Sequence, residues 1–136
     1  MAKETLNIGT VANDNTGDTL RNAASKINGN FDQLFSTVSV QTVTGDTLAT
    51  NEDGVFICDA TLGSIIITLP TAVDNSGKQF FVKQISANNA VTIKASATET
   101  IDGNNEKVIA GFFGNLNAYV SVISNGVQWY VTGVGQ

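Results

Sequence analysis

Between residues 20 and 38 the apolar residues recur at alternating intervals of four and three. These residues are Leu20, Ala24, Ile27, Phe31, Leu34 and Val38. A mean spacing of 3.5 residues places them on one narrow stripe of an α-helix, which is the pattern of a coiled-coil seam. Gly29 lies inside the segment and costs roughly 1 kcal/mol of helix stability relative to alanine. We therefore expect a helix from about residue 19 to 35 that depends on packing, with the stripe forming an interface between copies of the chain.

A second interpretation is that this helix packs on its own β-domain, with Ile27 and Phe31 in a private core. The 3.5-residue spacing favours self-association, because a helix that lies on its own sheet usually carries a broader stripe. The polar side of the helix, including Lys26, is expected to face solvent. Thr16 or Asp18 is expected to cap the helix. The polar cluster at residues 13–17 lacks the spacing of a calcium-binding EF-hand loop, so we interpret it as a turn.

From residue 38 onward the apolar period changes to two, with glycine, asparagine and aspartate between short alternating runs. Regularly spaced runs of this kind predict strands joined by turns. The expected strands are 38–43, 54–58, 64–69, 79–85, 90–94, 99–101, 107–110, 117–123 and 127–132. The sequence therefore predicts a mainly β chain, with an antiparallel β-sandwich or jelly-roll-like domain at 38–136. Residues 1–37 form an extended N-terminal arm and the one helix.

The last two strands predict part of the core. Asn125-Gly126 is the preferred dipeptide for a two-residue hairpin turn, and it pairs Val122 with Trp129 and Val120 with Val131 on one face. Trp129 could instead be a carbohydrate-stacking platform, but its valine neighbours favour the core. The residues expected in the core are Ile65, Ile67, Leu69, Val120, Val122, Trp129 and Val131.

Composition disfavours several classes of function. The chain has no histidine, which removes the commonest general base and the commonest zinc ligand. Its net charge is −5 and its basic residues are scattered, so a nucleic-acid partner is not expected. No apolar run approaches the roughly 20 residues that span a bilayer, and no apolar signal segment follows Met1. Cys58, the one cysteine, lies in an alternating run and is expected to be a buried, unreactive thiol.

We find no set of residues that predicts catalysis. Two carboxylates could form a glycosidase pair, but most candidates lie in predicted turns, where solvated carboxylates are usual. These candidates are Glu52, Asp53, Asp59, Asp74, Glu99, Asp102 and Glu106. The prediction is a non-enzymatic protein with no catalytic residue, no metal and no cofactor.

Two regions resemble proteins of tailed bacteriophages. In the first, residues 13–34 follow the pattern N-D-x-T-G-D-x-L-R-x-A-x-x-K-I-N-x-N-F-x-x-L, which is similar to a leader of tail, baseplate and fibre proteins. The second resembles a β-domain of fibre-type virion proteins, through 65–70, 77–83, 91–93, 100–103 and 124–130. The resemblance implies a structural virion protein, assembled in the host cytoplasm, whose partners are other virion proteins of the tail, baseplate or capsid.

Three functions remain open from the sequence. The first is a small trimeric fibre, tail or appendage protein, in which the helix anchors a homotrimer and the β-domain projects. The second is a capsid decoration protein, which the short chain favours. The third is a tip that binds a host surface glycan through uncharged loops and Tyr119 or Tyr130.

Overall fold

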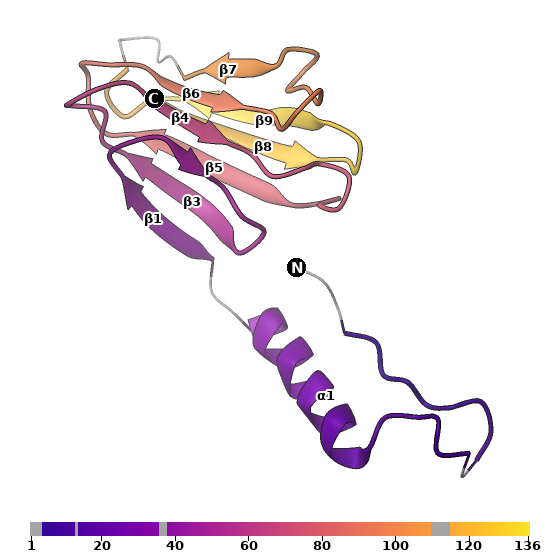
Figure 1. The fold of residues 1–136 in the computed structure, drawn as a ribbon. Coiled ribbons are helices and arrows are strands. Elements are labelled where there is room, and N and C mark those ends of the chain that lie inside the picture. The colour runs from indigo at the N-terminus through magenta and orange to yellow at the C-terminus, as the bar shows by residue number, and fades with distance from the viewer. Residues whose placement is uncertain (1–3, 13, 36–37, 110–114) are drawn as a thin grey trace. The chain divides into compact units, whose positions relative to one another are not determined.

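The computed structural model describes residues 4–12, 14–35, 38–109 and 115–136, which form two compact units, Met1–Thr37 and Val38–Gln136. The first unit holds an extended arm and the helix α1 (Leu20–Phe35), and the second holds the strands (Figure 1). The mainly β fold with one helix is confirmed for the described residues. None of these residues belongs to a helix with the length and apolarity needed to cross a membrane.

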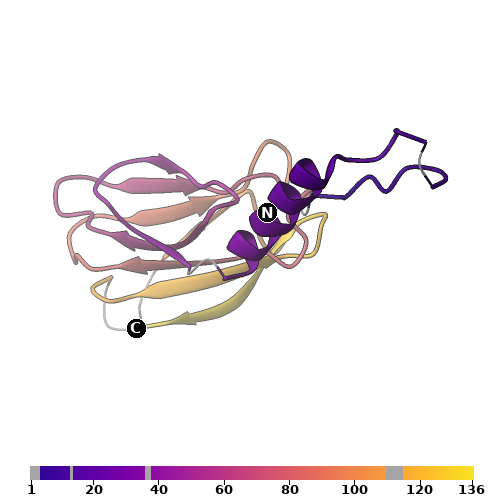
Figure 2. The same cartoon turned by 90° about the horizontal axis from the view of Figure 1, so that it is seen from below.

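The strands of the second unit form two sheets. The five-stranded sheet has the order β1 (Ser39–Val43), β3 (Asp53–Cys58), β5 (Gln79–Gln84), β8 (Tyr119–Ser124) and β9 (Trp129–Gly135). The four-stranded sheet has the order β2 (Thr47–Leu48), β4 (Ile65–Thr68), β6 (Val91–Lys94) and β7 (Glu106–Val108). Figure 2 shows that the strands of both sheets lie along roughly the same axis.

The strand pairing differs from the expected antiparallel arrangement. Strands β1, β3 and β5 pair in parallel, and so do β2, β4 and β6. Only the pairs formed by the last three strands are antiparallel. Each of the first five strands is therefore followed by a strand of the other sheet, and each of β3 to β6 pairs with the strand two places before it in the chain. The antiparallel prediction was wrong here because a period of two fixes which side chains face inward but not which strand becomes the neighbour.

Most predicted strands have a counterpart within a few residues of the expected bounds. The segment 99–101 is an exception, because only Ile101 takes part in isolated bridges. The sequence also missed β2, since two residues cannot show an alternating pattern. Ala110, the end of one predicted strand, lies outside the described residues.

The core lies between the two sheets and takes side chains from both. The rings of Phe80 and Trp129 lie 5.5 Å apart between centroids, and Phe56 lies 6.2 Å from Phe80. Val131 is partly buried against this cluster. Among the residues that the sequence places in the core, those with at most 2% of their surface exposed are Ile65, Ile67, Leu69, Val120, Val122 and Trp129.

The terminal hairpin is shifted by two residues from its expected register. Val122 pairs with Val131, and Ser124 pairs with Trp129. Asn125 Oδ1 accepts the amide N–H groups of Val127 and Gln128, both at 2.9 Å, so Asn125 stays at the first corner of the turn. Gly126 then supplies the positive φ of 87°. Next to the turn, a shift of two preserves the face on which each side chain lies, so Val122, Trp129 and Val131 still point inward. Beyond an irregularity between Ser121 and Val122, Val120 pairs with Val134 instead of Val131, a shift of three.

Cys58 provides a test of this core. The side chain is fully buried in β3, and burial raises the pKa of its thiol to about 12. We expect no reaction with an aromatic disulfide reagent at pH 8 in the native protein, and complete reaction in guanidinium, because only the thiolate attacks. The Leu62→Cys variant is the control, since residue 62 is 93% exposed. A native Cys58 that reacts as fast as this control would contradict the packing.

Candidate assembly site in the N-terminal unit

The helix α1 carries an apolar stripe that its own unit leaves exposed. The exposed fractions are 88% for Leu20, 41% for Ile27, 53% for Phe31 and 72% for Leu34, and Ala24 is also exposed. Spacings of three and four residues place these side chains on one side of the helix. Ile27, Asn30, Phe31 and Leu34 line a groove of about 250 Å³ on this stripe. The unit therefore presents a continuous apolar surface.

Val38, the last residue of the predicted seam, does not lie on the helix. The helix ends at Phe35, and Val38 directly precedes β1 in the second unit. A Cβ atom placed on Gly54 would collide with Cγ1 of Val38, so this side chain packs against the glycine of β3. The apolar spacing continued beyond the helix because Val38 and Val40 begin an alternating run that leads into β1. The expected helical position of Val38 is therefore wrong.

A second side of α1 binds the arm that precedes it. Lys26 Nζ lies 2.8 Å from Asp18 Oδ2 and donates to the backbone carbonyl of Thr5 at 3.2 Å. Asn30 Oδ1 accepts the N–H of Glu4 at 2.9 Å, and its Nδ2 donates to the carbonyl of Glu4 at 3.0 Å. The expectation that Lys26 faces solvent is wrong, because its long side chain reaches the returning arm.

Asp18 links the arm to the start of the helix. Its carboxylate accepts the N–H of Asn7 at 2.8 Å, and its own N–H donates to the carbonyl of Asn7 at 2.7 Å. The hydrogen bond from Lys26 and then the Asn7 N–H hold the pKa of Asp18 below its usual value. Since Asp18 is engaged in this way, the helix cap is Thr19, whose Oγ1 accepts the N–H of Asn22 at 3.3 Å.

Asp14 closes the loop between the arm and the helix. Its carboxylate accepts the N–H groups of Thr10, Val11 and Thr16 at 2.7–2.9 Å, and the hydroxyl of Thr10 at 2.7 Å. These donors, led by Val11 and the Thr10 hydroxyl, hold the pKa of Asp14 well below its usual range. Gly9, at a φ of 76°, is required here because a Cβ would lie 2.7 Å from Asp14 Oδ1. The polar residues of the leader thus fold the arm onto the helix.

The acidic residues considered for catalysis make local contacts. Asp53, which is buried, accepts the N–H and hydroxyl of Thr50 at 2.7 and 2.9 Å. Glu99 accepts the hydroxyl of Thr71 at 2.6 Å. The hydroxyl and N–H of Thr61 lower the pKa of Asp59. Each of these three carboxylates closes a loop of the second unit.

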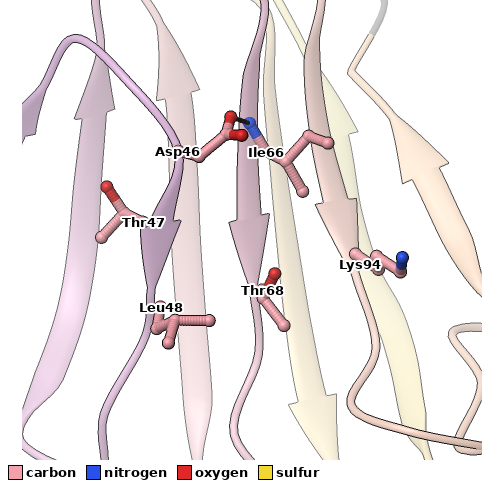
Figure 3. Close-up of a pocket in the computed structure, with 6 residues that line it drawn as sticks. All are labelled: Asp46, Thr47, Leu48, Ile66, Thr68 and Lys94. Atoms are coloured by element: carbon pink, nitrogen blue, oxygen red, sulfur yellow. Dashed lines mark hydrogen bonds between the residues drawn. The ribbon is translucent and has the colours of Figure 1, made fainter.

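The four-stranded sheet carries a shallow groove of about 220 Å³ (Figure 3). Asp46 Oδ1 accepts the N–H of Ile66 at 2.8 Å, so this carboxylate serves as the backbone partner of β4 just before β2 begins. Lys94 points away from Asp46 in this view. The polar groups therefore do not converge on one point in the groove. The lining residues are Asp46, Thr47, Leu48, Ile66, Thr68 and Lys94.

One protein family and one known protein are similar in sequence to this chain. Residues 3–61, which include α1, its arm and β1 to β3, match the family described as Bacteriophage T4 gp9/10-like protein, N-terminal. The baseplate wedge protein gp10 of Enterobacteria phage T4 is 30% identical over 118 residues, covering 74% of this chain. The resemblance to tailed-phage proteins that the sequence shows in its leader is confirmed over these residues. The chain spans 20% of the length of that relative.

The contacts of Lys26 predict a local effect of its removal. Lys26→Met keeps much of the chain length but loses the ammonium group, so we expect the arm to detach more often from α1. Water screens an exposed ion pair, so the effect is modest, and proteolysis within the arm should become up to about five-fold faster. Limited proteolysis followed by mass spectrometry measures this rate. Arg21→Met removes a charge from an exposed helix position and is the control. An equal rate of proteolysis for both variants would contradict the proposed role of Lys26 in holding the arm.

The hydrogen bonds of Asp14 predict that acid opens its loop. Because folding lowers the pKa of Asp14, its charged form stabilises the loop above about pH 4, the ordinary value for aspartate. This stabilisation is lost progressively as the pH falls below that value. NMR titration of the Asp14 carboxyl carbon should give a midpoint below the ordinary value. A midpoint at or above it would contradict the structure, and Asp14→Asn should remove the pH dependence of the Val11 amide shift.

Proposed function

We propose that this chain is a non-enzymatic structural protein of a phage baseplate or tail, and that it assembles as a homotrimer through α1. The proposal rests on the difference between two sides of this helix. Its polar side holds its own arm, while large apolar side chains on the adjacent stripe are 41–88% exposed. An exposed apolar surface of this kind commonly marks an interaction site.

Self-association suits both the composition and the length of the helix. The stripe has no charged residue, and its 3.5-residue spacing is that of helices that pack side by side. A helix of 16 residues with a central glycine is marginal alone, so it gains stability from a partner. Burying one large apolar side chain contributes about 1.5–3 kcal/mol, and each copy contributes several. Three copies are the number we propose for helices that precede projecting β-domains.

The position on the particle is proposed from the relatives. One match is to a protein named as a baseplate wedge protein, and the family match covers α1 and the arm before it. We therefore favour a role in the baseplate or tail. Only the small size of the domain favours capsid decoration. The partners in this proposal are further copies of the chain and other virion proteins. A glycan-binding tip is less favoured, since Tyr119 is stacked on Phe81 with ring centroids 5.1 Å apart.

Ile27→Asp tests the trimer directly. Three carboxylates would meet in a desolvated seam, where like charges cannot be paired, so we expect a monomer with an intact β-domain. Sedimentation velocity measures the mass, and fluorescence of the buried Trp129 reports the β-domain. Ser25→Asp adds the same charge on the opposite side of α1 and should leave the trimer unchanged. An Ile27→Asp protein that remains trimeric would exclude α1 as the assembly element.

A further inference from the structure

The two sheets present outer faces of different character. On the five-stranded sheet, the outward positions form rows of neighbours such as Val40, Val55 and Phe81 across β1, β3 and β5. Lys83 is the single charged residue among these outward positions. The apolar or aromatic residues on this face are Val40, Val55, Ile57, Phe81, Tyr119, Ile123 and Tyr130.

The four-stranded sheet is the contrasting case. Lys94 lies opposite Glu106 in the register of β6 and β7, and Asp46 lies beside β4. Hydroxyls of Thr68 and Thr92 separate the apolar side chains. Figure 3 shows part of this face, where charged and apolar groups alternate. Such a mixture is ordinary for a surface in contact with water.

On the outer face of the five-stranded sheet, which we call the apolar face, an aromatic ring lies against its neighbours. The ring of Tyr119 stacks on Phe81 at an interplanar angle of 23°. It covers Gly135, where a Cβ atom would lie 2.6 Å from Tyr119 Cε1. Lys83 Nζ donates to the carbonyl of Asn117 at 3.2 Å, which fixes its ammonium beside the chain that enters β8. The one charged group on this face therefore has a hydrogen-bond partner within its own chain.

The area of this face limits how tightly it can bind a partner. From strand spacing and residue rise, its outward positions cover on the order of 400 Å² of the sheet plane. This area includes polar positions and lies within the range of about 300–600 Å² that is usual for the largest apolar patch on a monomer, a patch that is often functional. It is about half of the roughly 800 Å² that each partner contributes to a standard interface. The face would thus bind weakly alone, but usefully where a second contact holds the partners together.

We propose that the outer face of the five-stranded sheet is a second self-association surface, packed against the β-unit of another copy of this chain. The inference rests on the trimer proposed above. Three residues separate α1 from β1, an edge strand of this sheet, so a trimer held at α1 keeps its β-units at high local concentration. The face has no acidic residue, so copies of a chain with net charge −5 meet there without carboxylate repulsion.

The test places lysines on each face of the full-length protein. Val40→Lys with Tyr130→Lys charges the apolar face at positions that are 63% and 42% exposed, so the fold should tolerate them. Leu48→Lys with Val108→Lys adds the same charge to the four-stranded sheet at positions that are 75% and 49% exposed. Sedimentation over a dilution series gives the concentration of half-dissociation, and Trp129 fluorescence confirms folding. We expect at least a ten-fold increase in that concentration for the first variant and no change for the second.

The outcomes separate this inference from the proposed function. Equal dissociation of both double variants would overturn the sheet interface while leaving the α1 trimer in place, and the face would then belong to a different virion protein. If Ile27→Asp stays oligomeric while the Val40–Tyr130 double variant becomes monomeric, the sheet interface is supported and the interface through α1 is excluded. A wild-type protein that is monomeric throughout the series would overturn both.

Discussion

The β-unit depends on one constraint, the burial of alternate side chains from two sheets in a shared apolar layer. Phe56, Phe80 and Trp129 occupy the centre of this layer, and residues of β4 and β6 close it from the other side. Because each of the first five strands is followed by a strand in the opposite sheet, the layer grows from both sides at once. Parallel neighbours follow from this path, since the intervening strand acts as the crossover connection.

The N-terminal unit solves a different problem, because it has no core of comparable size. Its arm is held by hydrogen bonds to carboxylate and amide side chains, above all those of Asp14, Asp18 and Asn30. These residues belong to the leader pattern shared with tailed-phage proteins. The pattern therefore has a local physical meaning, since it folds the arm onto α1 and leaves the apolar stripe open. In the assembly proposed above, packing against a partner supplies stability that the unit lacks internally.

The matched relatives and the geometry support one another at different levels. The family match covers the arm, α1 and the first strands. This part of the chain includes the polar side chains that hold the arm on the helix. The exposed stripe and the apolar sheet face explain physically why such a chain would be found in an assembly. Both surfaces lack acidic residues in an otherwise acidic protein, so contact between copies is possible at either one.

The sequence by itself determined the helix, most strand positions and the inward face of β4, β8 and β9, because a local period fixes which side chains share a side. It also marked Leu20, Ala24, Ile27, Phe31 and Leu34 as one stripe. It misplaced Val38 and the role of Lys26, since the helix end and the returning arm depend on contacts distant in sequence. Strand order, the parallel pairing and the two-residue shift of the last hairpin were decided only by the tertiary structure. Periodicity is unchanged by exchanging strand partners or by sliding a hairpin two residues, so only packing between the sheets selects among these arrangements.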